Sequence, residues 1–129
     1  FSRRYYKEDV VRKSKIDVAV TNIDGFCSER CIEKIGVLKM DIQGAELMAL
    51  QGAAEKLRHG LVGLIYTEVM FVPHFQGGPI FYELCSFLSD YGYTLFDIYN
   101  NFYAKNGQLS LGDAICISPV VRKRFFETP

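Results

Sequence analysis

The chain has 129 residues, of which 49% are hydrophobic and 14% aromatic, a composition typical of one folded domain and unlike that of a disordered segment. Its 15 basic and 15 acidic residues give a net charge of zero, so it lacks the positive field that favours nucleic acid or an anionic membrane as a partner. No apolar run approaches the roughly 20 residues that a membrane-spanning helix needs.

The four cysteines do not form the dense framework of a disulfide-rich domain, and no secretory signal is visible, so we expect a reducing, cytoplasmic location. Cys27 and Cys31 have the spacing of one helix face, but no other pair of cysteines or histidines supplies the further ligands of a zinc site. We therefore expect no metal centre of this kind. The chain begins at Phe1 rather than at Met, so we expect it to belong to a longer protein.

Two short elements are predicted ahead of residue 37. Apolar and polar residues alternate over 16–21, which predicts a strand. Asp24 is then expected to cap a helix that runs from about Gly25 to Ile35, and Gly36 is expected to end it.

The next segment predicts a strand followed by a long helix. Val37 to Met40 is a short apolar run that contains Lys39 and is followed directly by the carboxylate of Asp41. From Ala45 to about Arg58, apolar residues recur at helical spacing, and Gly60 follows as a stop. The expected apolar face of this helix consists of Leu47, Leu50, Ala54 and Leu57.

The second half of the chain continues the alternation of strands and helices. Residues 61–69 are apolar without alternation, which predicts a strand that is buried on both faces. Pro79 suits the first turn of a helix that Gly92 closes. The remaining expected elements are a strand over 94–100, a hairpin turn at Asn106-Gly107 and a last strand over 113–118.

Strands that alternate with helices predict an α/β fold, with a mostly parallel sheet and helices on its faces. Ligands in such sheets bind outside the carboxyl ends of the strands. Asp41 and Glu68 each close a predicted strand, and a single helix joins the two strands, so both carboxylates should lie at the same edge. This pair of acids is the main candidate for a functional site.

Each candidate residue also has a structural interpretation, and the sequence leaves both open. Asp41 could accept hydrogen bonds from the backbone of residues 43–45, or it could face a ligand. Glu68 could be exposed in the ligand crevice, or it could pair with Lys39. His74, on the loop after that strand, could be solvated or could take part in proton transfer.

The turn that follows Asp41 has two further residues of interest. Gly44 is expected to provide either a positive φ or a close approach of the backbone. Glu46 lies in the first turn of the expected helix, where an acid suits the helix dipole, so a structural role is expected for it.

The same segments resemble a known family. The run VLKMDIQGAELMALQGA contains a Lys-x-Asp-x-x-Gly-Ala-Glu motif and resembles the carboxyl-terminal half of the FkbM-type methyltransferases. VTNIDGF precedes this run, and IYTEVMF, FYELCSFLSDYGYTLFDIYN and GDAICI follow it in the family's order. The resemblance covers residues 17–118, which is nearly the whole chain.

This resemblance implies an S-adenosyl-methionine-dependent methyltransferase with a Rossmann-like sheet of seven strands, whose last strand is antiparallel to its neighbours. Members of the family methylate hydroxyl groups on natural products or sugars, so the implied partner is a small-molecule or glycan acceptor. The resemblance places Asp41 beside the methyl donor and the acceptor, and Glu68 at the end of the next strand. It also matches Asp24 to the acid of a Thr-Leu-Asp motif, with a shift of the match after Thr21.

From the residues and the resemblance together, we expect Asp41, Glu68 and His74 to be catalytic and Asp24 and Asp41 to contact the cofactor. A variant of this hypothesis has a Mg²⁺ ion held by Asp41 and Glu68, because two oxygen ligands are compatible with magnesium.

The chain departs from the family pattern where the cofactor loop should be. No G-x-G occurs in it, and no strand is predicted before residue 16. We therefore expect residues 1–129 to form a single partial domain that lacks the amino-terminal strands and is inactive alone. Residues 37–40 should then be an open sheet edge that can pair with another chain. The alternative is a non-catalytic binding or scaffolding module that keeps the fold without the cofactor loop.

Overall fold

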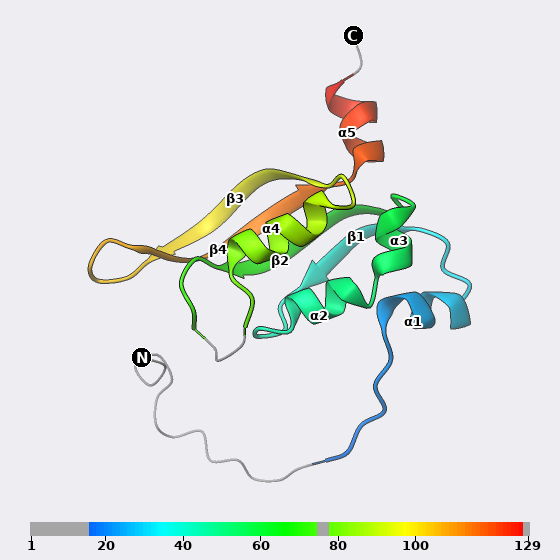
Figure 1. Ribbon diagram of the computed structural model, residues 1–129, viewed down its shortest axis with the longest axis horizontal. Helices are drawn as coiled ribbons and strands as arrows, with labels where there is room; N and C mark the ends of the chain where they lie inside the picture. Colours follow the sequence, from blue (N-terminus) through cyan, green and yellow to red (C-terminus); the bar gives the residue numbers. More distant parts are fainter. Residues whose placement is uncertain (1–15, 75–77, 128–129) are drawn as a thin grey trace.

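The computed structural model describes residues 16–74 and 78–127 (Figure 1). Phe1, on which we based the expectation that the chain belongs to a longer protein, lies outside these residues. In chain order the described elements are α1 (Ile23–Glu29), β1 (Ile35–Met40), α2 (Glu46–Gln51), α3 (Ala54–Arg58), β2 (Val62–Met70), α4 (Phe81–Ser89), β3 (Thr94–Tyr103), β4 (Leu109–Ile117) and α5 (Pro119–Phe126).

The described strands form one sheet of four strands in the order β1-β2-β4-β3. β1 and β2 are parallel neighbours, whereas β4 runs antiparallel to both β2 and β3. β1, β2 and β3 therefore run in one direction, and the last strand lies antiparallel between its two neighbours, as expected. The α/β class is confirmed, although only one of these strand pairings is parallel.

The helices α2, α3 and α4 pack against the same face of the sheet (Figure 1). Apolar side chains from these helices and from the strands form one core, and their removal from water is the main contribution to the stability of the fold. The buried members of this core are Met40, Leu50, Ala53, Leu57, Val62, Ile65, Val69, Leu84, Leu88, Tyr93, Ala114 and Cys116.

The opposite face of the sheet is covered much less. In β2, Ile65 and Thr67 are buried on the helix side, whereas Tyr66 and Glu68 point the other way and are partly exposed. The expectation of a strand buried on both faces is therefore wrong, because α2, α3 and α4 all cover one side. We call the second face the open face; the strand register places Lys39, Tyr66, Glu68 and Asp113 on it.

Residues 16–21 do not form the expected strand. Ile16, Val18 and Val20 are 81%, 69% and 89% exposed, and no described strand pairs with them. An alternating pattern becomes a strand only where a partner strand and a buried face are available to it.

α1 begins earlier than expected and is shorter. Its N-cap is Asn22, whose side-chain oxygen accepts a hydrogen bond of 2.7 Å from the N–H of Gly25, so the prediction of Asp24 as the cap is wrong. The helix ends at Glu29, and Gly36 lies inside β1 rather than at the end of a helix.

The single helix expected over 45–58 is two helices, α2 and α3, with Gly52 and Ala53 between them. The start of α1 packs against this break. The N–H of Asp24 donates to the carbonyl of Gly52 at 2.9 Å, and a Cβ on Gly52 would lie only 2.9 Å from the Cβ of Asn22. Contacts from a distant segment therefore interrupt a pattern that is helical throughout.

The hairpin forms around Gly107, which has a φ of 81°, but its strands are longer than expected because β3 and β4 pair along most of their length. The last helix, α5, is absent from the sequence-based prediction. Its signal is Ser118 followed by Pro119: the Ser118 hydroxyl accepts a hydrogen bond from the N–H of Val121 at 3.2 Å, and proline suits the first position of a helix.

All four cysteines are free. Cys27 is buried, whereas Cys31 is exposed and lies beyond the end of α1 with a φ of 56°, so the two do not share a helix face. Within the described part of the chain, no group of three or more His, Cys, Asp or Glu residues could hold a metal ion. None of the described helices is both long and apolar enough to cross a membrane.

Candidate active site

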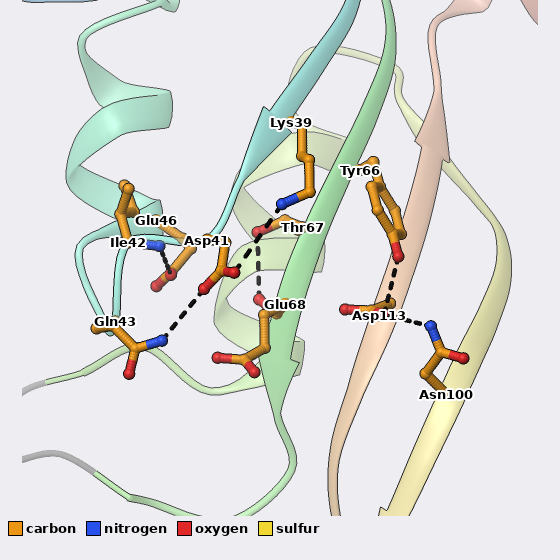
Figure 2. A network of polar contacts seen from close by, with 10 residues as sticks. All are labelled: Lys39, Asp41, Ile42, Gln43, Glu46, Tyr66, Thr67, Glu68, Asn100 and Asp113. Atoms are coloured by element: carbon orange, nitrogen blue, oxygen red, sulfur yellow. Dashed lines mark hydrogen bonds and ion pairs between the residues drawn. The ribbon is translucent and has the colours of Figure 1, made fainter.

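The carboxyl ends of β1 and β2 form a rim that carries both candidate acids (Figure 2). The parallel register pairs Met40 with Thr67, and Asp41 and Glu68 are the next residues of the two segments. β1 ends there, whereas β2 continues to Met70. The structure therefore brings the two acids together at one rim, as the strand order predicted.

The loop between β1 and α2 is held by Glu46. Its side chain is buried, with 2% of the residue exposed, and its two oxygens accept hydrogen bonds from the N–H of Ile42 at 3.2 Å and from the N–H of Gly44 at 3.0 Å. Gly44 has a φ of 99°, so its positive φ is the feature that the turn requires, and Gln43 before it has a φ of 55°. A buried carboxylate is tolerated here because both of its oxygens are hydrogen-bonded.

Asp41 is exposed. The backbone N–H groups of the turn, for which Asp41 was one possible acceptor, donate to Glu46 instead. Its carboxylate accepts a hydrogen bond of 3.1 Å from the side-chain amide of Gln43 and lies 3.9 Å from the ammonium group of Lys39. The Lys39 and Asp41 side chains are both more than half exposed, so this ion pair contributes little to stability. Lys39 thus lies beside Asp41 rather than pairing with Glu68.

The Glu68 carboxylate lies on the open face beside Asp41 and accepts no hydrogen bond from the residues that the structure describes. Desolvation raises its pKa above the ordinary glutamate value, and the negative charges of Asp41, Glu46 and Asp113 raise this pKa further, while His74 lowers it. A carboxylate with a raised pKa holds a proton more tightly than an ordinary one, which suits it to accept a proton from a ligand.

His74 follows the end of β2, and its Nε2 lies 2.8 Å from the hydroxyl of Ser110 in β4. Ser110 is buried, so this hydrogen bond holds the imidazole against the sheet. Ser110 alternates in step with the core residues Ala114 and Cys116, so it faces the helices, whereas Glu68 and Asp113 lie on the open face. His74 therefore follows the carboxyl end of β2, and its hydrogen bond to Ser110 lies on the helix side of the sheet.

A second polar group, which the sequence analysis did not identify, lies beside Glu68 on the open face (Figure 2). Asp113 of β4 is paired with Glu68 in the antiparallel register. Its Oδ2 accepts hydrogen bonds from the hydroxyl of Tyr66 at 2.9 Å and from the side-chain amide of Asn100 at 2.6 Å. The hydrogen bond to Asp113 raises the pKa of Tyr66. The sequence signal for this group is an acid at the start of the apolar run DAICI.

Asp24, the other candidate for cofactor contact, is engaged elsewhere. Its two carboxylate oxygens accept hydrogen bonds from the N–H groups of Glu55 at 2.9 Å and Lys56 at 3.1 Å, at the start of α3. The carboxylate therefore caps α3. Its contact with a cofactor stays a prediction, and its observed contacts are structural.

Two acids at the carboxyl ends of neighbouring strands, with a histidine beyond the end of β2, make this rim of the α/β domain the candidate site for a ligand. The family model of the methyltransferase FkbM domain matches residues 2–95, which is most of the chain, so the chain belongs to that family. Membership indicates methyl transfer as the chemistry of the domain. A search of curated proteins and a search of solved structures each gave no match.

Proposed function

We propose that this domain serves S-adenosyl-methionine-dependent transfer of a methyl group to a hydroxyl group, on a sugar or another natural product. The family supports methyl transfer. The strand order β1-β2-β4-β3, with an antiparallel strand between two strands of the opposite direction, supports a Rossmann-like sheet. The observation that carries the proposal is the Glu68 carboxylate, which lies at the rim, has a raised pKa and accepts no hydrogen bond from the described residues.

In this proposal Glu68 accepts the proton of the acceptor hydroxyl, which makes the acceptor oxygen nucleophilic. His74, held by Ser110, contacts the acceptor or receives the proton. Asp41 fits the cofactor, because an exposed carboxylate is complementary to the positive sulfonium and ammonium groups of S-adenosyl-methionine. When bound, the cofactor supplies the methyl group.

The test is transfer of a tritiated methyl group by the natural full-length protein. Glu68→Gln should lower kcat by roughly 10²–10⁴-fold, which is the usual contribution of a general base, without loss of cofactor binding. Asp41→Asn should weaken the binding of labelled cofactor. Glu29→Gln, which changes an exposed acid of α1, is the matched control and should alter neither quantity. A Glu68→Gln protein with the kcat of the wild type would show that Glu68 is not the base.

A Mg²⁺ ion held by Asp41 and Glu68 is a second form of the same proposal, because carboxylate oxygens and water are its preferred ligands. We favour direct proton removal by Glu68, because its pKa is raised and its carboxylate accepts no hydrogen bond from the described residues. Activity that is unchanged after treatment with EDTA would exclude the metal-dependent form.

The competing proposal is a binding or scaffolding module without catalysis. It is supported by the lack of a G-x-G cofactor loop in the sequence. For the same reason, we expect this chain alone to bind the cofactor weakly. Titration of labelled S-adenosyl-methionine against this chain and against the full-length protein separates the two proposals. Binding to the full-length protein supports the enzyme, whereas binding to neither supports the module.

A further inference from the structure

The helix α5 follows the last strand and lies beyond the residues that match the family model. None of its eight residues is buried, and Phe125 and Phe126 remain 65% and 57% exposed. A helix this short is marginal in water unless it packs against another element. Within the described structure, α5 therefore lacks the packing partner that such a helix needs.

The start of α5 is fixed to the body of the domain. The N–H of Ser118 donates to the carbonyl of Gly63 at 3.0 Å. Gly92 and Pro119 lie close together, since a Cβ on Gly92 would be 2.9 Å from Cγ of Pro119. From this base α5 extends away from α2 of its own molecule (Figure 1). Its last turn, which contains Phe125, is therefore placed to contact a second molecule.

The second half of α5 combines positive charge with an exposed aromatic ring. Arg122, Lys123 and Arg124 are consecutive, and Arg122 forms an ion pair with Glu127 at 2.7 Å. The guanidinium of Arg124 lies over the ring of Phe125, 5.2 Å from its centroid, which is a cation–π contact. This part of α5 is thus complementary to a surface that is apolar at its centre and negatively charged around it.

A groove with these properties lies on the solvent side of α2 and α4. Its volume is about 450 Å³, within the size range of pockets that bind ligands. Leu47 of α2 and Tyr82 and Phe87 of α4 supply its apolar walls, and Tyr82 is 68% exposed. The two charged residues among the described residues of the lining are both acids, Glu83 of α4 and Asp90 at its C-cap.

The length of α5 also matches this groove. Glu83 and Asp90 are about 10 Å apart along the axis of α4, and the eight residues of α5 span about 12 Å. A helix of this length can lie between the two acids with its cations near both. Opposite charge and matching length therefore favour α5 of a second copy as the occupant of the groove.

We propose that the second half of α5 of one molecule docks in the groove between α2 and α4 of a second copy of this chain. Phe125 is the apolar anchor, and the cations beside it face the two acids of the groove. Two different surfaces meet in this contact, so it is heterologous. A dimer keeps one unused helix and one unused groove, to which further copies can add.

The experiment is sedimentation velocity of the natural full-length protein. The unmodified protein should form a dimer and then larger species as its concentration rises. Phe125→Glu replaces the anchor by a negative charge, and Asp90→Lys repels the cations of α5. Each substitution should weaken self-association at least roughly tenfold, because it removes an aromatic anchor or places like charges opposite each other.

A mixture of the two variants tests the heterologous contact directly. The Asp90→Lys protein keeps an intact α5 and the Phe125→Glu protein keeps an intact groove, so their mixture should form a dimer and no larger species. Tyr103→Glu and Glu29→Lys are matched controls, because they make similar changes at exposed positions of the hairpin and of α1, and they should leave the association unchanged.

Three results would overturn the inference. They are an unmodified protein that stays monomeric, variants that associate as the unmodified protein does, and a mixture of the two variants that stays monomeric. Each of these results would leave the proposed methyl transfer standing, because the contact does not involve the rim that carries Asp41 and Glu68.

Discussion

Glu46 and Asp41 have different roles in the loop that leads from β1 to α2. Glu46 is buried and accepts the N–H hydrogen bonds of Ile42 and Gly44, whereas Asp41 is exposed at the rim. The sequence could not separate the two roles, because both acids lie within reach of the same turn and both suit a helix N-terminus. Burial separates them, since only Glu46 needs two backbone donors to offset its desolvation.

Removal of the Glu46 carboxylate should destabilise the protein. Glu46→Ala leaves the N–H groups of Ile42 and Gly44 without their acceptor in a partly buried turn, so we expect a loss of about 2 kcal/mol in the free energy of unfolding. The free energy of unfolding is measured by urea titration monitored by circular dichroism. Met48→Ala on the exposed side of α2 is the control and should change stability by less than about 0.5 kcal/mol. Equal effects of the two substitutions would contradict the structural role of Glu46.

The raised pKa of Glu68 makes stability depend on pH in a defined direction. Between 4.5, the ordinary pKa of glutamate, and its raised value, the folded state binds more protons at Glu68 than the unfolded state does. The free energy of unfolding therefore falls as pH rises through this window, and ionised Glu68 destabilises the fold above it.

Glu68→Gln should accordingly be more stable than the wild type at neutral pH, and the difference should disappear below pH 4.5. Urea midpoints measured from pH 4 to pH 8 test this, with Glu29→Gln as the exposed control. A stability difference that does not vary with pH would show that Glu68 titrates as an ordinary glutamate.

The break between α2 and α3 shows how one element sets the ends of another. The pattern from Ala45 to Arg58 is helical throughout, yet the start of α1 packs against Gly52 and the Asp24 carboxylate supplies a cap for α3. A periodic pattern indicates which face of a helix is apolar, but a capping side chain from a distant segment decides where the helix starts again. The prediction placed the helical residues correctly, but it gave one continuous helix where the structure has two.

The close approach of Gly52 and Asn22 should appear as an energetic coupling. Gly52→Ala adds a Cβ at 2.9 Å from the Cβ of Asn22, so it should destabilise the protein by about 1–3 kcal/mol through overpacking. Asn22→Gly alone should cost only a few tenths of a kcal/mol, because glycine is an acceptable N-cap. The double variant should recover part of the loss from Gly52→Ala. Strictly additive free energies would show that the contact does not limit the packing of α1.

At the level of the complete fold, β1 is an edge strand of the described sheet and pairs only with β2. Val37 on this strand is 62% exposed, and the open face beside it is not covered by α2, α3 or α4. An exposed edge strand with an apolar side chain is a template for pairing with another chain. The expected pairing of residues 37–40 with a partner chain therefore stays a prediction, for which the structure supplies an available edge.

Self-association of this chain should respond to a charge on that edge. We expect sedimentation velocity to show association of the isolated chain, and Val37→Lys to shift the distribution toward the monomer, because a lysine opposes pairing of edge strands. Met48→Lys, on the exposed side of α2 rather than on the edge strand, should leave the association unchanged. A stable monomer of the unmodified chain would refute this prediction.

Apolar periodicity and turn residues determined the α/β class, the positions of β1, β2 and α4, and the hairpin at Gly107, because these depend on which side chains must leave water and on where the backbone can reverse. The same reasoning placed Asp41 and Glu68 at one rim, since a single crossover joins their strands. Only the tertiary structure decided the partners of the polar side chains. Asp24 reaches Glu55, 31 positions away, and Tyr66 reaches Asp113, 47 positions away. A hydrogen bond between distant segments depends on the packing that brings them together, and the local sequence pattern does not predict that packing.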